Sequence, residues 1–214
     1  TGTGVGINAL LSRNLGEKNY SMANRVAGNA IFLGLVSYVV FALLGLLASR
    51  FYFSVQVEDP NIIALGHDYL SIVTVLSIGC FGQVLLSRLL QSTGKTFYSM
   101  VIQMVGAGLN LVLDPIMIFG LLGFPKMGVA GAALATVISQ LAGTALGVYY
   151  NLRKNPEIQF SLSTLRPSKP VISRIYGVGI PSILLQTVSS VLIFGLNQIL
   201  VAFSETATAV YGVF

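Results

Sequence analysis

Asp114 is the one charged residue in the apolar run from Thr96 to Pro125. If this run crosses a membrane, a carboxylate within it costs about 2.5–3.5 kcal/mol on insertion scales. Chains that accept this cost usually use the group to handle an ion or a substrate. Asp114 is therefore the leading candidate for chemistry in this sequence.

Asn110 precedes Asp114 by four residues, so the two polar side chains share one face of a helix. An alternative is that Asp114 only serves backbone groups left unpaired by Pro115, which has no N–H to donate. An Asn or Ser would serve that purpose without a charge. The pair therefore favours ion handling, with a proton or a sodium ion held at Asp114 and Asn110.

A third candidate, Thr136, stands in the run of small residues that begins at Gly128. Gly128, Ala132 and Thr136 repeat at intervals of four, and small residues at that spacing let two helices approach closely. Tight packing is the favoured role of this run. The hydroxyl of Thr136 is the exception, because we expect it to face the same cavity as Asp114.

Uncharged polar residues recur inside the other apolar runs. Each such residue taken alone most often forms one helix–helix hydrogen bond, which contributes about 0.6 kcal/mol of stability. As a set they indicate a polar interior, and the candidates for lining its cavity are Gln83, Gln186, Ser189 and Asn197.

The composition describes an all-α, multi-pass membrane protein. The mean hydropathy is +0.81 and only 9% of the residues are charged, where about 25% is usual in soluble domains. The basic residues lie in the connectors, a distribution that points to membrane topology and excludes a nucleic-acid partner. One Cys and one His give neither a disulfide framework nor a firm metal site, and no catalytic motif suggests an enzyme.

Five apolar runs are long enough to cross the bilayer, since about 20 helical residues span its hydrocarbon core. Four are free of charge, and the fifth qualifies once Asp114 is admitted. The runs are Val26 to Ser49, Tyr69 to Ser87, Thr96 to Leu122, Met127 to Leu152 and Ile175 to Ser204. The first eleven residues are read as the end of a sixth helix. Since the chain also starts without Met, we expect it to be a piece of a longer protein.

The Lys and Arg residues predict the orientation, because they accumulate on the cytoplasmic side. Alternating the five spans places ten of the twelve on one side and leaves Arg50 and Lys126 on the other. The long basic segment 153–174 is then cytoplasmic, either as a short interfacial helix or as a linker between two bundles. The segment Glu58 to Asn61 is external.

Four motifs occur in order along the chain: Leu11 to Asn19, Asn110 to Pro115, Gly128 to Thr136, and Gly179-Ile-Pro181. Together they resemble the multidrug and toxic compound extrusion (MATE) family of membrane antiporters. The resemblance covers nearly the whole chain, from the end of the family's second helix to just past its seventh.

The resemblance implies a transporter of twelve helices in two six-helix lobes. Residues 1–152 would be a portion of the N-terminal lobe, residues 153–174 the cytoplasmic connector between the lobes, and residues 175–214 the first helix of the C-terminal lobe. The remaining helices of the same protein, the lipid bilayer and organic cations would be the partners of this chain. Its location would be the cytoplasmic membrane.

The family exchanges protons or sodium for organic cations and drugs, without any other cofactor. By resemblance, Asn110 and Asp114 match the cation-coupling pair of the fifth helix, and Thr136 matches a hydroxyl of the sixth helix near that pair. One sodium-coupled branch carries a glutamate in the seventh helix, where this chain has Gln186, Ser189 and Ser190. This departure favours the proton as the coupling ion.

The sequence leaves two other functions open. A lipid-linked oligosaccharide flippase of the same superfamily would need a cavity lined with Arg or Lys, whereas the predicted spans carry no basic residue at their centres. A membrane scaffold without transport activity is the second alternative.

Overall fold

The computed structural model describes residues 2–56, 60–159 and 164–203, although the side chains of 55–56 and 197–203 are outside that description. The described residues form helices joined by short turns and contain no strand, which confirms the predicted all-α class. Its elements are α1 (Gly2–Gly16), α2 (Tyr20–Gln56), α3 (Pro60–Val75), α4 (Ile78–Ser92), α5 (Thr96–Phe119), the 3-10 turn η1 (Leu121–Gly123), α6 (Gly128–Lys154) and α7 (Lys169–Phe203).

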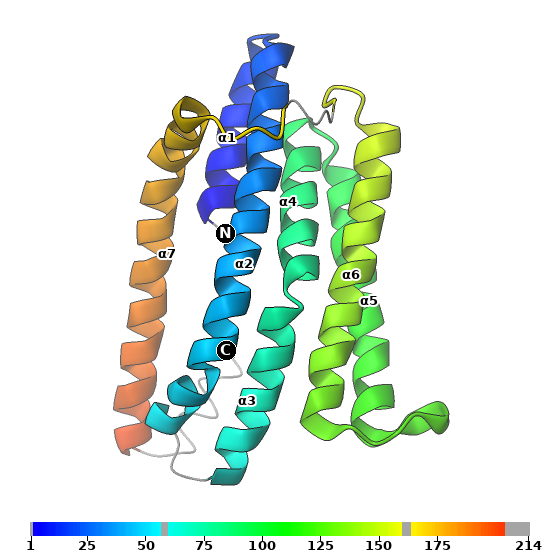
Figure 1. The fold of residues 1–214 in the computed structure, drawn as a ribbon, viewed down its shortest axis with the longest axis vertical. Helices are drawn as coiled ribbons and strands as arrows, with labels where there is room; N and C mark the ends of the chain where they lie inside the picture. The colour runs from blue at the N-terminus through cyan, green and yellow to red at the C-terminus, as the bar shows by residue number, and fades with distance from the viewer. Residues whose placement is uncertain (1, 57–59, 160–163, 204–214) are drawn as a thin grey trace.

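The helices form one elongated bundle in which α7 lies at one side and α5 and α6 lie at the other (Figure 1). Between them, α1 packs against α7, while α2 and α4 fill the middle. Within the described ranges, four helices are long and apolar enough to cross a membrane, and α3 with α4 makes a fifth span when this bent pair is taken together. The predicted five spans are confirmed on that count.

The second predicted span is broken rather than continuous. Helices α3 and α4 meet at Leu76 and Ser77 with a bend of 47°. One cause lies in Thr74, whose hydroxyl donates to the carbonyl of Leu70 at 2.6 Å, a contact that bends helices. Another is that the amide of Ser77 bonds to the carbonyl of Thr74, three residues back, instead of four.

Helices α6 and α7 extend beyond the charge-free runs. Helix α6 continues to Lys154 and α7 begins at Lys169, so both ends of the predicted connector 153–174 are helical. The reason is that long basic side chains can stay in a helix while their charged ends reach the aqueous interface. The role of this segment as a link between lobes stays a prediction.

The chain between α6 and α7 packs against the N-terminal end of α2. Asn24 Oδ1 accepts a hydrogen bond from the backbone N–H of Gln159 at 2.9 Å, and Asn29 Oδ1 accepts one from Ser168 at 2.7 Å. Ile158 is buried in the same core cluster as Leu11. The described part of this segment forms turns, so the predicted interfacial helix is not present there.

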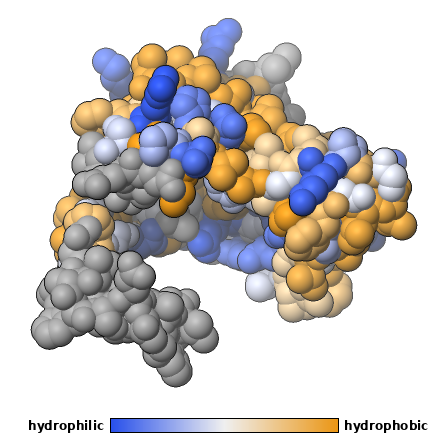
Figure 2. Space-filling model, turned by 90° about the horizontal axis from the view of Figure 1, so that it is seen from below, coloured by the Kyte–Doolittle hydropathy of each residue, from blue (hydrophilic) through white to orange (hydrophobic). Residues whose placement is uncertain are grey.

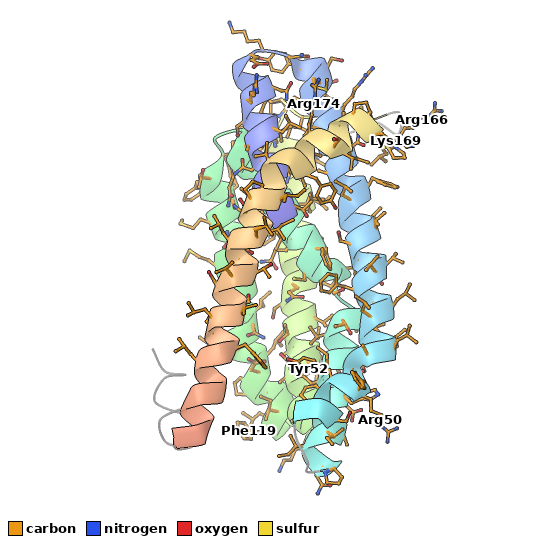
Figure 3. All side chains as sticks on the ribbon, turned by 90° about the vertical axis from the view of Figure 1, so that its left-hand side faces the viewer. Arg50, Tyr52, Phe119, Arg166, Lys169 and Arg174 are labelled. Atoms are coloured by element: carbon orange, nitrogen blue, oxygen red, sulfur yellow. The ribbon has the colours of Figure 1, made fainter. Side chains whose placement is uncertain are left out.

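Apolar side chains cover much of the outside of the bundle, as Figure 2 shows from one end. Leu47 is 82% exposed and Leu111 is 76% exposed. Large exposed apolar areas of this kind are the surface expected to face lipid. Basic residues stand at the ends, with Arg166 and Arg174 at one end and Arg50 at the opposite end (Figure 3).

Candidate functional site

Helix α5 carries the two leading candidates on one face. Asn110 and Asp114 are one turn apart, and the helix continues through Pro115 to Phe119. It ends at Gly120, whose φ of 74° is the left-handed conformation that glycine adopts at low cost. The backbone N–H of Gly120 bonds to the carbonyl of Ile116 at 3.0 Å. Pro115 therefore lies inside the helix, and Asp114 sits about one and a half turns before its end.

Three polar side chains from two helices meet at this point. Asn110 Nδ2 donates to Asp114 Oδ1 at 3.2 Å and is also 3.4 Å from Thr136 Oγ1. The Thr136 hydroxyl in turn donates to the carbonyl of Ala132 at 2.9 Å, so its oxygen acts as acceptor toward Asn110. All three residues are half-buried. Asn110 therefore bridges the carboxylate on α5 to the hydroxyl on α6.

A close approach of α5 and α6 makes this bridge possible. A Cβ atom on Gly131 would lie 2.5 Å from the carbonyl oxygen of Met117, which is closer than real Cβ contacts allow. The backbone N–H of Met127 donates to that same carbonyl at 3.1 Å. The structure thus agrees with the packing role predicted for the small residues that follow Gly128.

Gln83, predicted only as a residue lining a cavity, belongs to the same seam between α5 and α6. Its side-chain amide packs directly against Gly106 and Gly143. A Cβ atom on Gly106 would lie 3.0 Å from the nearest atom of this amide, and one on Gly143 would lie 2.7 Å from it. Gly106 precedes Asn110 by one helical turn. Gln83 therefore extends the polar line of Asn110 and Asp114 along α5.

The candidates on α7 lie elsewhere in the bundle. Gln186 and Ser189 are exposed, and the Ser189 hydroxyl donates to the carbonyl of Leu185 at 3.1 Å. Gln186 helps to line a surface hollow of about 480 Å³ together with Thr3 of α1. Because α7 and α5 flank opposite sides of the bundle (Figure 1), these residues are not part of the cluster at Asp114. The side chain of Asn197 is outside the described residues.

The cluster offers one group that can be protonated and a small set of oxygens for a cation. Asn110 presents its N–H donors to both neighbours, so a cation between Asp114 and Thr136 would require the amide to turn over and present its oxygen. In the part of the chain that the structure describes, no three His, Cys, Asp or Glu side chains gather around a common point.

Two buried asparagines at the C-terminal end of α6 were not predicted from the sequence. Asn151 Nδ2 donates to the carbonyl of Leu86 at 3.1 Å, and Asn155 Nδ2 donates to Asn151 Oδ1 at 3.2 Å. Lys95 Nζ lies 3.4 Å from Asn155 Oδ1 and 3.5 Å from a Glu157 carboxylate oxygen. These contacts tie α6 to α4 and to the turn before α5. The sequence feature that could have indicated these asparagines is the spacing of four residues between Asn151 and Asn155.

Comparison with known proteins agrees with this architecture. The MatE family model matches residues 1–116, which is more than half of the chain and includes Asn110 and Asp114. This chain belongs to the MatE family. The matched region ends before Thr136, so the helix α6 part of the cluster lies outside it.

The MatE chain is similar to the multidrug export protein MepA of Staphylococcus aureus (strain MRSA252). The two are 28% identical over 210 residues, which cover 98% of this chain and 46% of MepA. The chain therefore spans about half the length of the curated relatives it matches.

Two solved structures share its fold at 27% identity. One is a multidrug resistance MATE family transporter of the MOP superfamily in an inward-facing conformation, with a TM-score of 0.87 over 98% of this chain and 47% of that one. The other is described in the same words in an outward-facing conformation, with a TM-score of 0.88 over 99% of this chain and 46% of that one. Both are transporters, which agrees with the expectation that the MatE chain is not an enzyme.

Proposed function

We propose that this MatE chain is part of a cation-coupled antiporter that exports organic cations or drugs across the cytoplasmic membrane. The observation that carries the proposal is the cluster of Asp114, Asn110 and Thr136, which joins a carboxylate within a membrane span to polar groups of two helices. The multidrug export described for the similar MepA protein supports the choice of substrate.

Competition for one carboxylate is enough to couple two flows. A bound organic cation or a sodium ion favours the ionised form of Asp114, whereas a proton neutralises it and removes the attraction. Alternating access then carries the cation one way and the coupling ion the other. The similar TM-scores to inward-facing and outward-facing relatives support a bundle that keeps its shape while access changes.

The hydrogen bonds of Asn110 favour a proton as the coupling ion. The Asn110 amide donates to the carboxylate, and the Thr136 hydroxyl already donates its hydrogen to the carbonyl of Ala132. A proton can add to Asp114 without moving either neighbour. A sodium ion wants several oxygen ligands at fixed distance, which would require the Asn110 amide to turn over.

The test uses the full-length protein in vesicles and the substitution Asp114→Asn. We expect this variant to insert and fold, because it removes a costly intramembrane charge. Export of an organic cation should fall at least tenfold, while Asp114→Glu keeps part of the activity. Normal export by a folded Asp114→Asn protein would contradict the coupling role.

The same vesicles distinguish the coupling ions. An imposed pH gradient in sodium-free buffer should drive export if the coupling ion is a proton. Export that requires a sodium gradient would assign sodium instead and would still support the cluster. If neither gradient drives export of any organic cation, the antiporter proposal is wrong and the flippase and the scaffold remain as alternatives.

A further inference from the structure

The break between α3 and α4 interrupts a membrane span at about the level of its middle. The first residues of a new helix have N–H groups without a partner inside that helix, and here they belong to Ile78, Gly79 and Cys80. In hydrocarbon each unpaired backbone group is costly, so a break of this kind is tolerated only inside protein or beside water.

Neighbouring helices satisfy part of the break with their own side chains. Tyr38 of α2 donates its hydroxyl to the carbonyl of Val75 at 3.2 Å. Thr144 of α6 donates to the carbonyl of Gly79 at 2.7 Å. Polar side chains from two sides therefore already converge on the interrupted backbone.

Two buried polar atoms in this region lack a partner among the described residues. One is the hydroxyl oxygen of Ser77, a residue that is only 7% exposed. The other is Oε1 of Gln140, on the part of α6 that lies against the start of α4. A Cβ atom on Gly79 would lie 3.2 Å from the Cβ of Gln140, which places this segment of α6 directly at the break.

We propose that the break between α3 and α4 is a water-binding site in the middle of the span. Bound water donates to Oε1 of Gln140, donates to or accepts from the Ser77 hydroxyl, and accepts from the N–H groups at the start of α4. Buried water typically makes about three hydrogen bonds to polar groups of this kind, and the groups at the break are sufficient in number. An apolar occupant would leave all of them unpaired.

The position of Gln140 places this water close to the cluster of Asp114, Asn110 and Thr136. Gln140 follows Thr136 by one turn on the same face of α6. Water at the break therefore lies about one helical turn from the hydroxyl that contacts Asn110. The proposal rests on the backbone break and the buried groups, so it stands whether or not Asp114 couples ions.

The experiment is radiolytic hydroxyl labelling of the purified full-length protein, because radicals formed from bound water modify the side chains beside it. Cys80 and Phe81 follow the break and serve as reporters. The double variant Ser77→Ala, Gln140→Leu removes the two water-binding side chains and should lower labelling of both reporters severalfold. The matched control is Ser139→Ala, since the buried Ser139 hydroxyl already donates to the carbonyl of Ala135 at 2.8 Å. This control and Asp114→Asn should leave the labelling unchanged.

If the double variant fails to fold, hydrogen exchange on the unaltered protein tests the water site instead. The amides of 78–80 should exchange faster than those of 137–143, which lie at the same level in an unbroken helix. Reporter labelling that is equal in the double variant and the wild type would overturn the proposal. Equal protection of the two amide segments would do the same.

Discussion

At the scale of single residues, Asn110 is the centre of the cluster because it touches both of the other members. Its amide lies between the Asp114 carboxylate and the Thr136 hydroxyl, at 3.2 Å and 3.4 Å. Asn110 is thus expected to hold the carboxylate in position beside the Thr136 hydroxyl.

Asn110→Ala should therefore reduce export less than Asp114→Asn does. The change removes a neutral donor and leaves the Asp114 carboxylate in place. Thr136→Ser keeps the hydroxyl and serves as the control, with export close to that of the unaltered protein. Initial export rates in vesicles with equal protein content measure all three. A defect in Asn110→Ala as complete as that of Asp114→Asn would show that the amide itself is essential.

At the scale of elements, glycines decide how closely the helices approach. Gly131 faces the carbonyl of Met117 across the contact between α5 and α6, with no room for a side chain. Gly108 lies in the interior of α5, and a Cβ there would meet nothing within 4 Å. The two positions are both helical, so they separate the effect of packing from that of helix propensity.

Gly131→Ala should destabilise the protein by about 1–3 kcal/mol, because the methyl group forces α5 and α6 apart. Gly108→Ala should be neutral or stabilise by up to about 1 kcal/mol, since alanine is the better helix former. Thermal unfolding in detergent compares the two variants. Export should fall in Gly131→Ala as well, because Asn110 and Thr136 are carried by the two helices that separate. Equal stability of both variants would contradict the packing argument.

At the scale of the whole molecule, the basic residues mark the two ends of the bundle. Figure 3 shows Arg166, Lys169 and Arg174 together at one end and Arg50 at the other. The segment that carries Arg166 also packs against α2 through Asn24 and Asn29, so it lies on the bundle surface at that end. The positive-inside rule predicts that this end faces the cytoplasm.

Single cysteines at two exposed positions test that orientation. Arg166→Cys should react with a membrane-impermeant thiol reagent only from the cytoplasmic side, and Lys126→Cys only from the outside. Both changes are made in a full-length protein in which the other cysteines have been replaced. Labelling of Lys126→Cys from the cytoplasmic side alone would reverse the topology.

Local chemistry made the spans and the pairing of Asn110 with Asp114 predictable from the sequence. Membrane helices satisfy their own backbone hydrogen bonds, so their existence follows from apolar length alone. The i, i+4 spacing placed Asn110 and Asp114 on one face, because helix geometry is fixed. The charge bias likewise predicted which connectors share an end of the bundle.

Contacts between helices required the tertiary structure. The bend at Ser77 arises from side chains that reach carbonyls, from the tight fit of Gly79 on α6, and from Tyr38 and Thr144 on neighbouring helices. The contact of Asn110 with Thr136, the place of Gln83 and the separation of Gln186 also depend on which helices are neighbours. Hydropathy and spacing describe each helix alone, whereas these features depend on the packing of one helix against another.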